Sequence, residues 1–214
     1  MKKSLLVITV LSALPLLGAE PENIVVNGDF QTGTGNFFYE TPGWYNRGAG
    51  AGQGYNARAK MGALGLGAYA ATINDRYDAA TGKLGPTAHF QKTAHVIREG
   101  DSFTLSYQWR PFDDFWQKSR DTVRFVLSAT EDDTLGSPVV WSVTLNSDFF
   151  TGSIISMKDV THTTGVVPAA AVGKKLMICF FGVDTEDGVT GKTNFARVDN
   201  IVIFSEMANV QPKK

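Results

Sequence analysis

The sequence predicts an all-β fold: a two-sheet β-sandwich of the jelly-roll type. Short runs in which apolar and polar residues alternate recur along most of the chain, and turns rich in glycine and acidic residues separate them. Beyond the first 19 residues no long stretch has the apolar spacing of a helix, and only "PAAAVGKK" at 168–175 could form one turn. Because no proline- or serine-rich linker divides the chain, a single domain is the simplest arrangement.

The N-terminal segment "MKKSLLVITVLSALPLLGAE" has the features of a secretory signal peptide: two lysines, an apolar run and small residues at positions 18 and 19. We expect residues 1–19 to be removed, residues 20–204 to form the domain, and residues 205–214 to form a polar tail. The product would then be exported, either secreted or periplasmic, without membrane insertion. The remaining chain carries 18 basic and 21 acidic side chains, a formal net charge of −3 that argues against binding nucleic acid.

Nine strands are expected from alternation and from β-branched or aromatic content. They lie at about residues 23–27, 68–73, 87–97, 102–110, 122–129, 138–146, 153–164, 175–183 and 194–204. Turn sequences separate them at 27–29, 98–101, 130–138 and 184–193. A glycine- and alanine-rich stretch at 47–67 interrupts this pattern, and it is either a functional or metal-bound loop or a small-residue segment packed against a sheet.

The clearest strand is "SFTLSYQWR", in which two sets of side chains alternate. One face carries Phe103, Leu105, Tyr107 and Trp109, and the other carries Thr104, Ser106, Gln108 and Arg110. This parity places Trp109 in the core, and Pro111 ends the strand because it lacks an N–H group. Trp141 shares parity with neighbouring valines in "PVVWSVTL" and is also expected in the core.

The loop after this strand, "PFDDFW", combines aromatic rings with carboxylates and is the first candidate ligand site. Proteins bind sugars by stacking aromatic rings on the apolar faces of sugar rings while polar groups contact the hydroxyls. The predicted ligand-binding residues are Phe112, Asp113, Asp114, Phe115 and Trp116 in the loop, with Gln108 and Arg110 on the strand before it. Trp44 and Tyr45 after a Pro-Gly turn form a second set, although Trp44 could instead cap the core.

The residue types that usually carry catalysis or metals are poorly placed. Cys179 is the single cysteine and lies in an apolar strand, so we expect a buried, unreactive side chain. His89 and His95 are six residues apart, about 20 Å along a strand, and cannot share a metal. Each is expected at the surface or at a sheet edge, and His162 stands alone. The "GKT" at 191–193 lacks the earlier glycine and the following helix of a phosphate-binding loop.

Four short segments occur in an order that resembles a known family. They are "NIVVNGDFQTG" at 23–33, "TPGW" at 41–44, "EGDSFTLSY" at 99–107 and "ARVDNIVI" at 196–203. Together they resemble the galactose-binding-like β-jelly-roll carbohydrate-binding modules of secreted bacterial proteins. The resemblance spans nearly the whole chain after residue 19. It implies an exported, non-catalytic protein whose partner is a polysaccharide or glycan.

The resemblance also implies a structural calcium that ties the first strand to the last. Asp199 matches the aspartate of the family's last strand, whereas Gln31 stands where the family has a glutamate. Calcium accepts amide and carbonyl oxygens as well as carboxylates, but fewer charges weaken its binding. Alternatively, Asp199 and Asn200 bond only the backbone of the neighbouring loop.

Two other functions remain open. The same sandwich could serve a cell-envelope or extracellular-matrix protein through structural or adhesive protein contacts. It could also be a jelly-roll enzyme that cleaves glycans, which needs two carboxylates facing each other across a cleft. The acid pairs at 113–114 and 131–133 are expected in solvated loops instead, so no enzyme activity is predicted.

Overall fold

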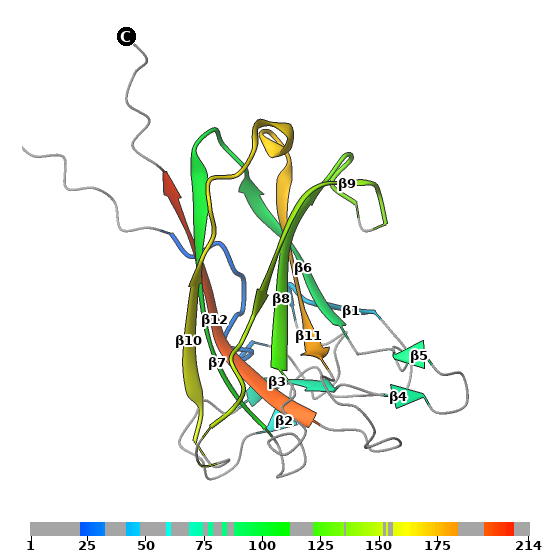
Figure 1. Ribbon diagram of the computed structural model, residues 1–214, viewed down its shortest axis with the longest axis vertical. Coiled ribbons are helices and arrows are strands. Elements are labelled where there is room, and N and C mark those ends of the chain that lie inside the picture. The colour runs from blue at the N-terminus through cyan, green and yellow to red at the C-terminus, as the bar shows by residue number, and fades with distance from the viewer. Residues whose placement is uncertain are drawn as a thin grey trace, which may run out of the picture.

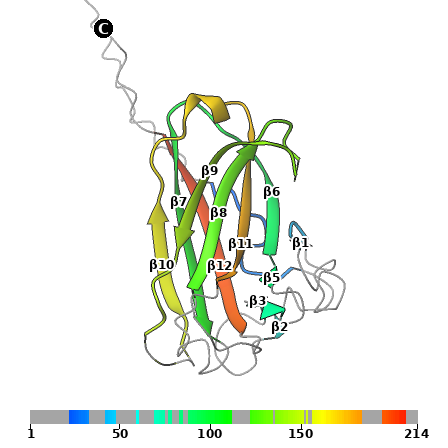
Figure 2. The same cartoon turned by 45° about the vertical axis from the view of Figure 1, so that its right-hand side comes forward.

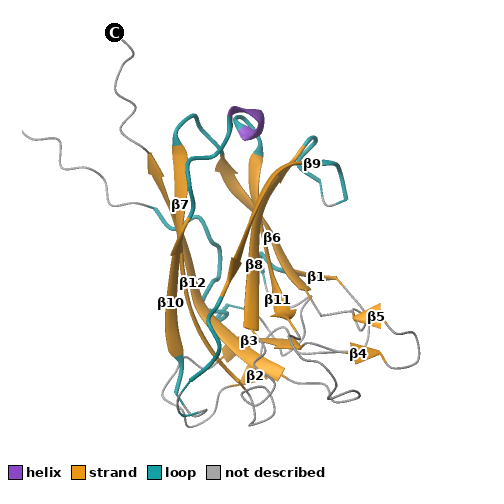
Figure 3. Ribbon diagram, viewed as in Figure 1, coloured by secondary structure: helices purple, strands orange, loops and turns teal. Residues whose placement is uncertain are grey.

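The structure, a computed structural model, confirms the β-sandwich (Figures 1 and 2). It describes residues 22–32, 42–47, 59–60, 69–74, 77–78, 83–84, 88–111, 122–134, 136–151, 153, 156–183 and 195–207. The predicted signal peptide, the loop at 112–121 and residues 208–214 lie outside this part of the chain, as does most of the glycine-rich stretch. Nearly all of the regular structure is strand, as Figure 3 shows by colour.

Two antiparallel five-stranded sheets face each other. Sheet I contains, in spatial order, β1 (Tyr45–Arg47), β6 (Ala88–Val96), β11 (Lys175–Val183), β8 (Thr122–Thr130) and β9 (Val139–Asn146). Sheet II contains β10 (Lys158–Thr163), β7 (Asp101–Pro111), β12 (Phe195–Met207), β3 (Tyr69–Asn74) and β2 (Ala59–Lys60). The short strands β4 (Tyr77–Asp78) and β5 (Lys83–Leu84) pair with each other, and η2 (Ala169–Ala171) is a single 3₁₀ turn.

The chain changes sheet at every step from β6 to β12 except between β8 and β9. This alternation is the connectivity of a jelly roll, and it brings the inner faces of both sheets into one core. The predicted parity of β7 and β8 is confirmed, because their apolar side chains are fully buried or nearly so. The Tyr107 and Phe125 ring centroids lie 4.4 Å apart across the core, and Phe125 stacks on Phe180 at 5.1 Å.

Trp109 is completely buried, as predicted, and its ring meets Phe150 edge-on with centroids 5.2 Å apart. Trp141 packs against the core but is only partly buried, because β9 is an edge strand of sheet I and neighbours β8 alone. The prediction of a core position for Trp141 therefore holds only in part.

The N-terminal segment lies against β12 rather than forming the separate strand predicted at 23–27. The Ile24 N–H donates to the Ile203 carbonyl at 2.8 Å, and the Ile201 N–H donates to the Gly28 carbonyl at 2.9 Å. A Cβ atom at Gly28 would lie 2.0 Å from the Ile201 carbonyl oxygen, so only glycine fits there. β12 also runs to Met207, three residues beyond the predicted strand end.

The prediction that His89 lies at the surface or at a sheet edge is wrong. Its side chain is completely buried, stacks on Phe180 with centroids 4.9 Å apart, and bonds the Thr72 carbonyl oxygen through Nε2 at 2.8 Å. Burial lowers the pKa of His89 to about 4. Cys179 is half-buried rather than fully buried, and burial raises the pKa of its thiol to about 12. No helix among the described residues is long and apolar enough to cross a membrane.

Candidate functional site

The outer face of sheet II carries a continuous band of hydrogen-bonding side chains, here called the polar face. It arises because β7 alternates inward apolar with outward polar residues, and the register with β10 places the outward Asp159, Thr161 and Thr163 opposite Gln108, Ser106 and Thr104. Its members are Thr104, Ser106 and Gln108 of β7, Asp159, Thr161 and Thr163 of β10, and Asn200 and Glu206 of β12.

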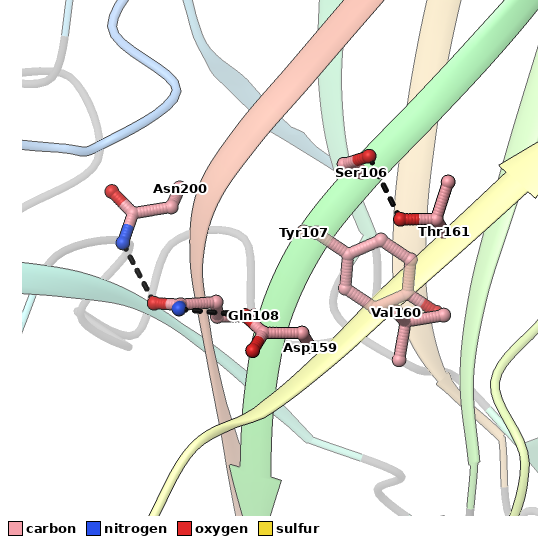
Figure 4. A pocket seen from close by; sticks show the side chains of 7 residues that line it. All are labelled: Ser106, Tyr107, Gln108, Asp159, Val160, Thr161 and Asn200. Atoms are coloured by element: carbon pink, nitrogen blue, oxygen red, sulfur yellow. Dashed lines mark hydrogen bonds between the residues drawn. The ribbon is translucent and has the colours of Figure 1, made fainter.

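Gln108 lies at the centre of one row and is held from both sides, as Figure 4 shows. Its Nε2 donates to Asp159 Oδ1 at 2.7 Å, and its Oε1 accepts from Asn200 Nδ2 at 2.7 Å. The three side chains come from three adjacent strands of sheet II. Each has further donor or acceptor positions beyond these two bonds, so the row presents polar atoms in a fixed orientation.

Two further rows follow along the same face. The hydroxyls of Ser106 and Thr161 lie 3.0 Å apart (Figure 4). Those of Thr104 and Thr163 lie 3.2 Å apart. The Thr104 hydroxyl also donates to Glu206 Oε1 at 2.7 Å. Cross-strand bonds of this kind reduce the side-chain freedom that a ligand would otherwise have to restrict.

A shallow pocket of about 310 Å³ lies over the first two rows (Figure 4). Its lining residues are Ser106, Tyr107, Gln108, Asp159, Val160, Thr161 and Asn200. The pocket thus combines hydroxyl, amide and carboxylate groups on one exposed sheet face.

Asn200 reaches this face through an irregularity in β12. The register between β12 and β7 shifts between Asp199 and Val202, and Asn200 has a φ of 51°. A bulge of this kind redirects a side chain, and asparagine tolerates left-handed backbone better than most residues. Asp199 is buried beside this bulge, whereas Asn200 is exposed.

Phe204 is a further half-buried residue of sheet II. It pairs with Thr104 in the ladder between β12 and β7, and it alternates with the buried Ile203, which places it on the outer face. Thr104 and Gln108 are four residues apart on β7, so Phe204 lies about 14 Å from the Gln108 row. The outer face therefore offers an aromatic side chain beside a polar band.

The structure places the residues that were predicted to bind a ligand in different environments. Gln108 lies at the centre of the polar face. Arg110 is only 8% exposed and Arg197 is its ladder partner; burial and the charge of Arg110 lower the pKa of Arg197 to about 10. Arg110 is therefore largely covered rather than an open hydroxyl-binding side chain. The loop set Phe112, Asp113, Asp114, Phe115 and Trp116 lies outside the described residues.

The prediction that Trp44 stacks on a ligand is wrong, because its ring is buried in the core. It is 3% exposed, and its ring packs against Phe30 and Phe180 with centroids 5.4 and 5.2 Å away. Its Nε1 donates to the Asn27 carbonyl at 3.0 Å, so Trp44 closes the core as the alternative interpretation proposed. Tyr45 is 60% exposed but belongs to β1 in sheet I, away from the polar face.

Asp199, the predicted calcium ligand, is almost fully buried. Its Oδ1 accepts the Asn200 N–H at 2.8 Å, and its Oδ2 is buried with no hydrogen-bond partner among the described residues. Burial raises the pKa of Asp199 to about 7, and the nearby charge of Asp29 acts in the same direction. Gln31 Nε2 donates to the Asp29 carbonyl oxygen at 2.5 Å. Asp29 is therefore a second acidic residue near Asp199, and it was not predicted from the sequence.

A serine, an aspartate and a histidine also meet at the other end of the sandwich, but in an order unsuited to nucleophilic catalysis. Asp101 lies in the middle: its Oδ2 is 2.9 Å from His95 Nε2, and its Oδ1 accepts from Ser205 Oγ at 2.8 Å. A catalytic base must contact the nucleophile itself, with the carboxylate behind it. This cluster therefore links β6, β7 and β12 and is not arranged as a catalytic triad.

Sequence reasoning missed Asp159, Asn200 and Phe204. The alternation in "KDVTHT" places Asp159 and Thr161 on one face, so parity alone could have found them once β10 was paired with β7. Asn200 depends on the bulge, for which a single sequence has no clear signal.

The chain matches no protein-family model and no curated protein sequence. Among solved structures it is similar to one named as a putative sugar-binding protein from Bacteroides thetaiotaomicron. The TM-score is 0.51 and the identity 8%, and the match covers 86% of this chain and 100% of that chain. It is also similar to the enzymatically active domain of tailspike protein 4 from bacteriophage CBA120, with a TM-score of 0.50 and 12% identity over 86% of this chain. This chain spans only 21% of that tailspike chain.

A carbohydrate-binding module described as CBM4 matches with a TM-score of 0.42 and 15% identity, over 77% of this chain and 95% of the module. The matched structures thus include both binding proteins and an enzyme domain. The likeness to the Bacteroides thetaiotaomicron protein and to the tailspike domain, at 8% and 12% identity, supports the β-sandwich fold and says nothing about the activity of this chain.

Proposed function

We propose that this protein is a non-catalytic carbohydrate-binding protein and that the polar face of sheet II is its glycan-binding surface. The observation that carries the proposal is the row Asp159–Gln108–Asn200, in which two 2.7 Å hydrogen bonds hold an amide between a carboxylate and a second amide. Planar amides and carboxylates in fixed orientations suit sugar hydroxyls, each of which both donates and accepts.

The length of the polar face favours a chain of sugars over a single one. From the Gln108 row to the Thr104 row the face extends about 14 Å along β7, enough for two or three sugar rings in a linear glycan. Phe204, opposite Thr104, would supply an apolar surface for one ring. The sugar-binding name of the Bacteroides thetaiotaomicron neighbour supports the same class of ligand. The loop aromatics Phe115 and Trp116 remain predicted stacking residues.

The proposal is tested by binding of the purified protein to a panel of polysaccharides, followed by variants of the polar face. Gln108→Ala removes the residue that both neighbours bond, so we expect affinity for any ligand found to fall by about tenfold or more. Phe204→Ala should weaken binding as well. Thr144→Ala is the matched control, because it changes an exposed strand residue on sheet I. Absence of binding across the panel, together with self-association in light scattering, would favour the structural or adhesive function instead.

We further propose a calcium ion between the N-terminal segment and β12. The described residues fit such an ion in three respects: the buried Asp199 Oδ2 has no hydrogen-bond partner among them, the Asp29 charge lies close to it, and all the available ligands are oxygens. Among the described residues no group of three or more His, Cys, Asp or Glu side chains could hold a metal ion, so carbonyl or amide oxygens such as that of Gln31 would complete the ligand set.

Calcium would supply a positive charge that stabilises ionised Asp199 and joins the two chain segments. Calcium at 100 times its Kd should therefore raise the melting temperature by about 5–11 °C, and a chelator should reverse the rise. Asp199→Asn should abolish this response, whereas Asp132→Asn in an exposed turn should keep it. An unchanged melting temperature in the parent protein would show that Asp199 serves only the local backbone.

We also infer that the protein is exported, on the basis of the N-terminal 19 residues alone. N-terminal sequencing of the protein from its native host would test this, because cleavage after Ala19 should leave Glu20 as the first residue.

A further inference from the structure

A second pocket lies on the other sheet, where β8 begins and β9 ends. It has a volume of about 340 Å³, and its lining residues are Thr122, Arg124, Asn146, Ser147, Asp148 and Phe149. Sheet I and sheet II form opposite layers of the sandwich, so this pocket is separate from the polar face.

Arg124 is held in place on the outer face of sheet I. It is the ladder partner of Asn146 on one side and of Phe181 on the other. Its Nε donates to Asn146 Oδ1 at 2.8 Å, and its guanidinium carbon lies 5.9 Å from the Phe181 ring centroid, a cation–π distance. The bond to Asn146 uses one of the five N–H donors of the guanidinium, whose plane is thereby oriented.

Phe149 and Asp148 contribute the other two features of the pocket. Phe149 is 46% exposed, which is more than is usual for a phenylalanine. Asp148 beside it is exposed and supplies carboxylate oxygens, which accept hydrogen bonds only. The pocket therefore brings an apolar ring, a fixed donor group and an acceptor group together.

We propose that this pocket is a second sugar-binding site, and that it takes a neutral sugar through two adjacent hydroxyls. In this inference, which rests on the proposed carbohydrate binding, one sugar face packs on Phe149, Arg124 donates to the hydroxyl oxygens, and Asp148 accepts from a hydroxyl hydrogen. A vicinal diol offers both kinds of partner, whereas the carboxylate of a uronic acid can accept from Arg124 but has no hydrogen to donate to Asp148 and carries the same charge.

Affinity electrophoresis of the full protein in gels that contain xylan, mixed-linkage β-glucan, mannan, galactan or polygalacturonate tests this inference. At least one neutral polysaccharide should retard the protein. Arg124→Ala and Phe149→Ala should each lower that affinity by about tenfold. Arg124→Lys should lower it nearly as much, because an ammonium keeps the charge but loses the planar fork. Circular dichroism of each variant should match the parent protein.

The matched controls are Arg98→Ala and Val166→Ala, which change exposed residues at the opposite end of the sandwich and should leave retardation unchanged. If Gln108→Ala abolishes retardation while Arg124→Ala and Phe149→Ala do not reduce it, the second site is refuted and the polar face stands. Stronger retardation by polygalacturonate that depends on Arg124 would refute the neutral ligand. Absence of retardation in all five gels would refute the proposed function, and this inference with it.

Discussion

Asp101 joins three strands at the end of the sandwich that carries η2 (Figure 1). Its side chain is completely buried at the start of β7. The carboxylate accepts hydrogen bonds from the Arg98 N–H at 2.8 Å and from Ser205 Oγ at 2.8 Å, and it lies 2.9 Å from His95 Nε2. His95 belongs to β6 and Ser205 to β12, so one carboxylate links both sheets.

Asp101→Ala should destabilise the protein by about 3 kcal/mol, because it leaves buried donors without their charged acceptor. For a chain of this size the melting temperature would fall by about 6–12 °C. Asp101→Asn should cost less, since an amide oxygen can accept from Arg98 and His95 while its NH₂ group donates to Ser205 Oγ. Glu99→Gln, an exposed acid in the same turn, is the control and should have little effect.

The pH dependence of the unfolding free energy distinguishes the contribution of the Asp101 charge from that of its packing. Burial alone would raise the pKa of Asp101, but the hydrogen bonds from Arg98, His95 and Ser205 together outweigh it and leave the pKa below its ordinary value. The charged form therefore contributes stability above the unfolded-state pKa of about 3.9, and this contribution is lost as pH falls through the lower folded-state pKa. The stability difference between the parent protein and Asp101→Asn should shrink below about pH 4, as measured by urea unfolding.

A melting temperature of Asp101→Ala within 2 °C of the parent protein would refute this reasoning, with about 2 °C being the smallest shift that 1 kcal/mol would produce. Equal losses for Asp101→Ala and Glu99→Gln would do the same, since they would mean that the contacts of Asp101 contribute nothing specific.

Two other perturbations test the packing. Gly28→Ala places a Cβ atom 2.0 Å from the Ile201 carbonyl oxygen and should cost about 3 kcal/mol or prevent folding, whereas Gly165→Ala, with no atom within 4 Å of its Cβ, should cost less than about 1 kcal/mol. Equal thermal melts would contradict the account of the N-terminal segment. Because the folded-state pKa of His89 is about 4, below its unfolded value of 6.5, stability should fall by up to about 3 kcal/mol as pH drops from 6.5 to 4. His89→Gln should flatten that part of the urea-unfolding profile, and an unchanged slope would contradict a buried neutral imidazole.

The fold was predictable because burial in a sandwich follows a period of two residues. In β7 and β8 every second side chain is apolar, so parity alone placed Trp109 in the core and Gln108 outside it. The buried position of His89 was not predictable in the same way. A histidine on a strand looks the same whether a partner such as the Thr72 carbonyl lies across the core or water surrounds it.

The candidate site was predictable only in part, because it is assembled from strands far apart in the sequence. Gln108 followed from the parity of one strand, but its bonds to Asp159 and Asn200 depend on how β10 and β12 register with β7. Trp44 shows the opposite case: an aromatic residue after a Pro-Gly turn suits a ligand platform by composition, yet the rings of Phe30 and Phe180 enclose it.

The most direct test of the central claim is the affinity of the purified protein for the polysaccharide that it binds best, compared between the parent protein and Gln108→Ala. The polar face predicts measurable glycan binding that falls by about tenfold or more in Gln108→Ala and stays unchanged in Thr144→Ala. Glycan binding that both variants retain in full would place the binding surface elsewhere on the sandwich and contradict the assignment to the outer face of sheet II.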